Sequence, residues 1–224
     1  MGTVIGDLLP YAVGVAISPI PIIAVILMLL SKNATRTSTG FLIGWVAGIV
    51  VVTSLVLVLV GQAKSTSTGP STLSSWLKLI FGVLVLLLAV KQWRTRPKPG
   101  ETGTMPQWMS AIDTFTFVKA LGLGFALSGI NPKNLLMCFA AGTTIAAAQL
   151  SAGGDVAAVA VFTVLAASTV LTPVVLYLAA KQRMAQPLTE LRGWLTQNNA
   201  TVMAVLLLVI GVVLLGKGIG GLST

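Results

Sequence analysis

The sequence has no histidine, a single cysteine and only five acidic residues in 224 positions. One cysteine excludes an intrachain disulfide and a Cys-x-x-Cys redox motif. Without histidine, nothing favours a zinc site, and we expect neither a metal nor a cofactor. Walker A and Rossmann fingerprints are missing, and no acid, base and nucleophile converge, so an enzyme is the least favoured class.

Charge of either sign is scarce. Charged residues make up 8% of the chain and hydrophobic residues 55%, with a mean hydropathy of +0.96, whereas a soluble domain has about a quarter charged residues. The net charge of +9 could indicate a nucleic-acid partner, but the basic residues cluster in short linkers between apolar runs. We therefore expect no nucleic acid and predict a polytopic membrane protein.

Long apolar runs set the predicted topology, because a membrane-crossing helix needs about 20 such residues. Six segments qualify: 4–30, 38–61, 73–91, 116–148, 155–180 and 199–220. The N-terminus lacks the features of a cleaved signal peptide, so the first segment is expected to be retained. We predict an all-α fold with six transmembrane helices. The polar linker 92–115 separates two three-helix repeats, 1–91 and 116–224.

Basic residues are shared unequally between the two sides of the predicted membrane. The linkers after spans one, three and five hold ten of the fourteen: Lys32, Arg36, Lys91, Arg94, Arg96, Lys98, Lys119, Lys181, Arg183 and Arg192. The other side has Lys64, Lys78 and Lys217. Cytoplasmic loops carry the excess of Lys and Arg. We therefore expect the linker 92–115 to be cytoplasmic and both termini to lie outside.

A short repeat relates the two halves. Residues 14–20, GVAISPI, match residues 124–130, GFALSGI, at Gly, Ala, Ser and Ile, and Pro21 or Pro132 follows. Each half has an odd number of spans, so the repeat must be inverted in the membrane. Inverted repeats with helices interrupted at matching positions are typical of transporters.

Prolines predict interruptions in helices one and four, because an interior proline removes a hydrogen bond and clashes with the preceding turn. Ser18-Pro19 and Asn131-Pro132 each have the pattern of an N-cap followed by the first helical position. We expect each of these spans to be two half-helices, with the second half restarting near the bilayer midplane.

Lys133 follows the second interruption, about 21 Å along a helix from Lys119. None of the acidic residues is placed to pair with it: Asp7, Glu101, Asp113, Asp155 and Glu190 lie in linkers or at span ends. Two restarted helices would add positive partial charge, and a charge at this depth costs a few kcal/mol. Either Lys133 is neutral or the site receives an anion. The alternative is a simple kink with Lys133 in a water-filled crevice.

Hydroxyl and glycine residues complete the candidates. Hydroxyls in membrane helices either bond to their own backbone or line a pathway. Gly40, Gly44 and Gly48 either pack two helices of one protomer or form a homodimer seam. The predicted substrate-binding set is Lys133, Asn131, Pro132, Ser18, Pro19, Pro21, Ser128, Thr53, Ser54, Ser168, Thr169 and Thr172.

Several stretches resemble a known family. ALSGINPKNLLM (126–137) is similar to the Asn-Pro-Lys hallmark of the LysE-type exporter superfamily. AISPIPIIAVILMLLS (16–31), GFLIGW (40–45) and NNATVMAVLLLVIGVVLLGKGI (198–219) resemble its peptidoglycolipid-addressing branch, which includes the sulfolipid-1-addressing proteins of mycobacteria.

The resemblance implies a six-helix inner-membrane protein of actinobacteria that helps to move glycolipids or related cell-envelope components outward. The functional positions that it transfers are Ser18, Pro19, Pro21, Asn131, Pro132 and Lys133. We expect an exporter of glycolipid or other anionic amphiphilic molecules, with membrane lipids as partners. Two alternatives remain: a small-solute exporter of the amino-acid type, and an accessory subunit of a lipid-synthesis or export complex.

Overall fold

The computed structural model describes residues 1–65, 72–96 and 107–222, and these residues form helices joined by short turns, with no strand. The elements are α1 (Gly2–Ala16), α2 (Pro19–Leu29), α3 (Ala34–Ser65), α4 (Thr72–Arg94), the 3-10 helix η1 (Gln107–Thr114), α5 (Phe117–Gly129), α6 (Pro132–Ala147) and α7 (Ala152–Gly220). The predicted all-α class is confirmed. Part of the linker 92–115 lies outside the described residues.

Among the described residues, three stretches are long and apolar enough to cross a membrane: Ala34–Gln62 of α3, and Ala152–Ala180 and Arg183–Gly220 of α7. The pair α1 and α2, bent by 55°, makes a fourth if it counts as one span. The helix α4 and the pair α5–α6 occupy the expected segments 73–91 and 116–148 but are not among these candidates. The chain is therefore a multi-pass membrane protein, and six spans in an inverted repeat stay a prediction.

The outward-facing surface of the bundle is apolar. Leu87 on α4 is 62% exposed, Val118 on α5 74% and Val156 on α7 70%. In water, a surface with large apolar side chains exposed on so many helices would promote association. In a bilayer, the same side chains face lipid, which supports the membrane assignment.

Both predicted interruptions are present. The helix α1 ends at Ala16 and α2 begins at Pro19, while α5 ends at Gly129 and α6 begins at Pro132. Each second half-helix thus starts with a proline, whose missing N–H needs no partner at that position.

The linker expected between spans five and six, residues 181–198, is much shorter in the structure. Only Ala180 departs from helical geometry (φ −143°, ψ 48°), and helix resumes from Arg183. Met184, Leu188 and Leu195 recur at helical spacing and pack against the core. The polar residues between them therefore lie on the outer face of an amphipathic helix, which the charge of the segment concealed.

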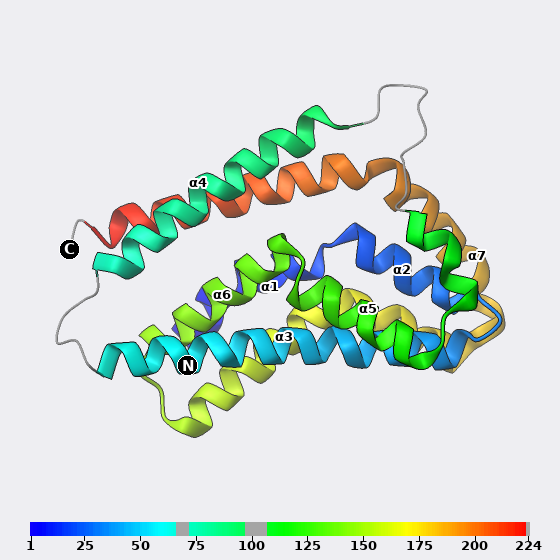
Figure 1. The fold of residues 1–224 in the computed structure, drawn as a ribbon, viewed down its shortest axis with the longest axis horizontal. Coiled ribbons are helices and arrows are strands. Elements are labelled where there is room, and N and C mark those ends of the chain that lie inside the picture. Colours follow the sequence, from blue (N-terminus) through cyan, green and yellow to red (C-terminus); the bar gives the residue numbers. More distant parts are fainter. Residues whose placement is uncertain (66–71, 97–106, 223–224) are drawn as a thin grey trace.

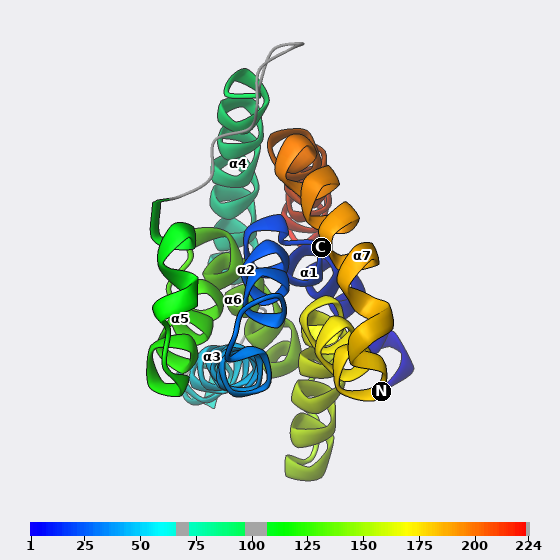
Figure 2. The same ribbon diagram turned by 90° about the vertical axis from the view of Figure 1, so that its right-hand side faces the viewer.

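The two halves pack closely along their lengths. The helix α3 lies along α5, α4 lies along α7, and α2 is at the centre of the bundle (Figure 2). Nearly all of α2 is buried because it is apolar on every face. In Figure 1 the α2–α3 turn, the start of α5 and the bend of α7 lie at one end of the long axis, and the start of α4 and the C-terminus lie at the other.

Glycines allow α3 and α5 to approach closely. A Cβ at Gly40 would lie 2.7 Å from the carbonyl oxygen of Phe117, and one at Gly44 or Gly48 would overlap atoms of α5 in the same way. The glycine face of α3 therefore packs within one protomer and is covered by α5. The alternative, a homodimer, stays a prediction, and this face is not free to form its seam.

We expect Gly44→Ala to lower the stability of the folded protein by about 1–3 kcal/mol, because the added methyl group meets backbone that cannot move aside. Gly122→Ala is the matched control, since a Cβ there has nothing within 4 Å and alanine favours a helix. Thermal unfolding in detergent measures both. Equal melting temperatures for the two variants would contradict the close α3–α5 contact.

Candidate functional site

The site begins where α1 breaks. Ile17 leaves the helical region (φ −83°, ψ 68°), and Pro19 has no N–H with which to bond the carbonyl of Val15. The last carbonyls of α1 therefore need other donors, because lipid supplies none.

Side chains supply most of those donors. The Ser18 hydroxyl donates to the Val15 carbonyl at 2.7 Å, and the backbone N–H of Ser18 donates to Ala16 at 2.9 Å. Thr169, which comes from α7, also donates its hydroxyl to the Ala16 carbonyl. Ser18 was expected to cap α2 with its side chain; it is the N-cap residue, but its hydroxyl turns back to α1 instead.

Lys133 satisfies the remaining carbonyl. Its Nζ donates to the carbonyl oxygen of Gly14 at 2.6 Å and to the hydroxyl of Ser18. The side chain is 5% exposed and reaches across from the first turn of α6 to the end of α1. In the part of the chain that the structure describes, it contacts no carboxylate, as the sequence predicted.

The electrostatic surroundings of Lys133 differ from the expectation in one respect. The sequence predicts two positive helix N-termini near this lysine. The structure brings its Nζ to the C-terminal carbonyls of α1, where the partial charge is negative. The backbone therefore stabilises the ammonium in part, and the expectation of purely positive surroundings is wrong. A break in a helix makes a C-terminus as well as an N-terminus.

Asparagine side chains secure the second break. Asn131 accepts the backbone N–H of Lys133 at 3.1 Å as the N-cap of α6, as expected. Asn134, fully buried, donates its Nδ2 to the carbonyl of Leu127 at 2.8 Å. Its Oδ1 lies 3.3 Å from the Ser18 hydroxyl. Asn134 was not predicted, although an asparagine one residue after the lysine of an Asn-Pro-Lys motif was a visible signal.

The two breaks thus meet, and we call Ser18, Lys133, Asn134 and the Gly14 carbonyl the Lys133 cluster. Its members come from α1, the α1–α2 break and α6, so it joins the first half of the chain to the second. It is a buried polar network where the two interrupted helices meet.

The register of the sequence repeat does not match the breaks. GVAISPI and GFALSGI align Ser18 with Ser128, but Ser128 lies in the last turn of α5 and bonds to Gly124 at 3.0 Å. The N-cap that corresponds to Ser18 is Asn131. Pro19 and Pro132 are therefore the corresponding prolines, as the N-cap patterns predicted, whereas Pro21 lies two residues into α2.

Other predicted residues lie at varying distances from this cluster. Pro19 and Pro21 are buried at the start of α2, and Pro132 is exposed at the start of α6. Thr53 is buried on α3 beside the Cys138 thiol of α6. These residues shape the break or the α3–α6 contact without a hydrogen bond to Lys133.

The remaining hydroxyls belong elsewhere. Ser54 is half-buried on α3, Ser168 bonds to the carbonyl of Leu165 in its own helix at 2.8 Å, and Thr172 is exposed on α7. Of the predicted α7 hydroxyls, Thr169 is the one that reaches the α1 break.

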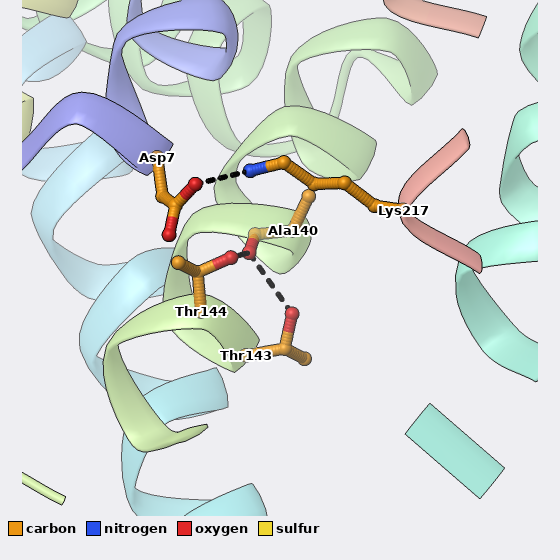
Figure 3. Close-up of polar contacts among 5 residues, drawn as sticks. All are labelled: Asp7, Ala140, Thr143, Thr144 and Lys217. Atoms are coloured by element: carbon orange, nitrogen blue, oxygen red, sulfur yellow. Dashed lines mark hydrogen bonds and ion pairs between the residues drawn. The ribbon is translucent and has the colours of Figure 1, made fainter. Parts of the chain in front are cut away.

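We expect Asn134→Leu to destabilise the protein by about 1–3 kcal/mol, because the Leu127 carbonyl loses its buried side-chain donor. Thr143→Val on the same helix is the control, since Thr143 bonds only to the Ala140 carbonyl of α6, which Thr144 also bonds (Figure 3). Chemical or thermal unfolding in detergent measures the difference. If both variants unfold alike, the Asn134 bond contributes nothing specific.

Comparison with known proteins places the chain in a family. No curated protein and no solved structure matches it. One family model does, over residues 8–220, which includes both breaks and the whole Lys133 cluster. The chain belongs to the family described as Sap, sulfolipid-1-addressing protein.

Proposed function

We propose that this membrane protein translocates glycolipids or other anionic amphiphilic molecules of the cell envelope, and that Lys133 binds their anionic group. Family membership indicates a membrane protein involved in sulfolipid addressing. The proposal adds the site and the mechanism, and it rests on the geometry of the Lys133 cluster.

One observation carries the proposal: a buried lysine without a counter-ion. A protonated lysine has three N–H donors, and the Lys133 Nζ has two acceptors among the described residues, Gly14 and Ser18. Both acceptors are formally neutral. Burying a charge without its counter-charge is unfavourable by several kcal/mol. A sulfate, phosphate or carboxylate would supply both the missing acceptor and the missing charge.

Binding of an anion also has a structural consequence. An anion held only by the third N–H of Lys133 leaves the Gly14 bond in place, whereas an anion that draws the ammonium away from Gly14 releases the end of α1 from α6. The break at Ile17 and Ser18 lets α1 change its direction relative to α2. The directions of the two helices already differ by 55°. The lysine therefore couples cargo binding to movement of one half-helix.

The topology that we propose has six crossings as two inverted repeats, with both termini outside the bacterial plasma membrane. Four of the six predicted segments fall within single helices, and the other two, 4–30 and 116–148, cover the interrupted pairs α1–α2 and α5–α6. Lys32, Arg36, Lys119 and Arg183 belong to segments at one end of the long axis, the proposed cytoplasmic end (Figure 1). The relation to the LysE-type exporters is part of this proposal and rests on Asn131-Pro132-Lys133.

A small-solute exporter is less well supported. The amino group of a zwitterion would need acceptors beside Lys133, but the carbonyls of Gly14, Val15 and Ala16 already have donors. An accessory subunit without transport would use the same lysine only to hold the two halves together, and the experiment below separates that function from transport.

We expect Lys133→Met to abolish lipid transfer, because the methionine side chain keeps most of the length of lysine but binds no anion. Proteoliposomes that contain the full chain and an anionic glycolipid with a fluorescent acyl chain report transfer between leaflets by quenching from outside. Lys119→Met is the matched control, since Lys119 is exposed at the start of α5. It should transfer lipid at the normal rate.

Stability is measured on the same samples, because Lys133 also caps α1. Ser18→Ala removes a hydroxyl at the same break but keeps the ammonium, so it should retain transfer when folded. Normal transfer by folded Lys133→Met would overturn the mechanism. A loss of transfer that follows melting temperature equally in Ser18→Ala and Lys133→Met would assign the lysine to structure alone.

A further inference from the structure

A second cluster of charged residues lies away from the Lys133 cluster, at the end of the bundle that holds the C-terminus. Four helices surround a cleft of about 460 Å³ there: α1, α4, α6 and α7. Its lining includes Thr3, Asp7, Lys78, Thr144 and Lys217. We call this the outer cleft; none of the sequence patterns predicted it.

The charged residues among those that line the outer cleft are two lysines, Lys78 and Lys217, and one carboxylate, Asp7. The Lys217 Nζ lies 2.8 Å from Asp7 Oδ1, and this ion pair joins the end of α7 to α1 (Figure 3). The two side chains are 31% and 47% exposed. A pair this open to its surroundings contributes about 0–1 kcal/mol, so an incoming anion can displace the aspartate.

Tyr11 lies next to residues that line the cleft. Its side chain is fully buried. The Lys217 ammonium lies 5.5 Å from the centre of the Tyr11 ring, and Thr144 is also a neighbour of Tyr11. Tyr11 does not itself line the cleft, so its ring supports the Lys217 ammonium from behind the cleft wall.

The spacing of residues connects this cleft with the Lys133 cluster. Asp7, Tyr11 and Gly14 follow the i, i+4, i+7 pattern and lie on one face of α1. Two helical turns, about 10 Å, separate Asp7 from Gly14, whose carbonyl accepts from Lys133. Lys217 lies two turns beyond Ile210 on α7, and a Cβ at Gly14 would meet the Ile210 side chain. The outer cleft and the Lys133 cluster therefore lie about two helical turns apart along the same face of α1.

We infer that the outer cleft binds the oxyanion group, sulfate or phosphate ester, of a lipid headgroup, with Lys78 and Lys217 as its ligands and Asp7 as the counter-ion that it replaces. The cleft has the size of a small-molecule site and accommodates a headgroup. The acyl chains would stay in the bilayer, against exposed apolar side chains such as Ile80 on α4. The choice of lipid rests on the proposed function, whereas binding itself does not require Lys133.

Calorimetric titration of the full chain in a nonionic detergent tests this site. The probes are a short-chain sulfated galactolipid, the same lipid without sulfate, and inorganic sulfate. We expect the sulfated lipid to bind at least about ten-fold more tightly than either of the others, since a charge-assisted hydrogen bond contributes roughly 1.5–3 kcal/mol. Equal binding of inorganic sulfate would overturn a lipid site, and equal binding of the uncharged lipid would overturn recognition of the oxyanion.

Variants identify the residues. Lys217→Gln should weaken binding of the sulfated lipid about ten-fold, and Asp7→Asn should strengthen it because the competing carboxylate is gone. Lys91→Gln, exposed in the last turn of α4, is the charge-matched control and should bind normally. If Asp7→Asn weakens binding as much as Lys217→Gln does, the ion pair is structural and the site is not as inferred.

Lys133→Met separates this inference from the proposed function. The variant should still bind the sulfated lipid at the outer cleft while it fails to transfer lipid between leaflets. Loss of cleft binding in folded Lys133→Met would overturn an independent outer site. Transfer that persists in this variant would overturn the proposed function and leave the outer cleft standing.

Discussion

The structure depends on one constraint: a helix that breaks inside a membrane must find donors for the carbonyls at its end. Water cannot supply them there. Ser18, Thr169 and Lys133 supply them for α1, from its own break, from α7 and from α6. The interruption of α1 therefore requires the second half of the chain, and the two halves cannot separate at the break without exposing polar backbone to lipid.

This dependence also explains the position of the Asn-Pro-Lys motif. Pro132 begins α6 and Asn131 caps it, so the first turn of α6 is fixed in orientation. The side chain of Lys133 then leaves that turn toward the end of α1. Close packing of α3 against α5 through Gly40, Gly44 and Gly48 fixes the half-helix that precedes the motif.

Much of the fold could be predicted because proline and apolar length act locally. Pro19 and Pro132 stop helices by their own covalent structure, so both breaks were visible in the sequence. Contacts between distant residues were not visible: Lys133 with Gly14, Asn134 with Leu127, and Lys217 with Asp7 depend on how helices pack. The prediction of a linker near residues 181–198 was wrong because the charged residues there lie on the outer face of a helix whose apolar residues are buried.

Capping by itself does not require a charged side chain. Asn134 satisfies the carbonyl of Leu127 and Thr169 that of Ala16, and both are neutral. A lysine in the same structural position adds a desolvation cost of a few kcal/mol that an amide or hydroxyl would avoid. The Gly14 carbonyl and the α1 C-terminus offset part of that cost, but neither supplies a full negative charge. The anionic cargo that we propose would supply it, and it would bind most tightly when the site is driest, because electrostatic attraction strengthens as the dielectric falls. Stability alone therefore explains why a donor is needed at Gly14, whereas the proposed cargo would explain why that donor is Lys133.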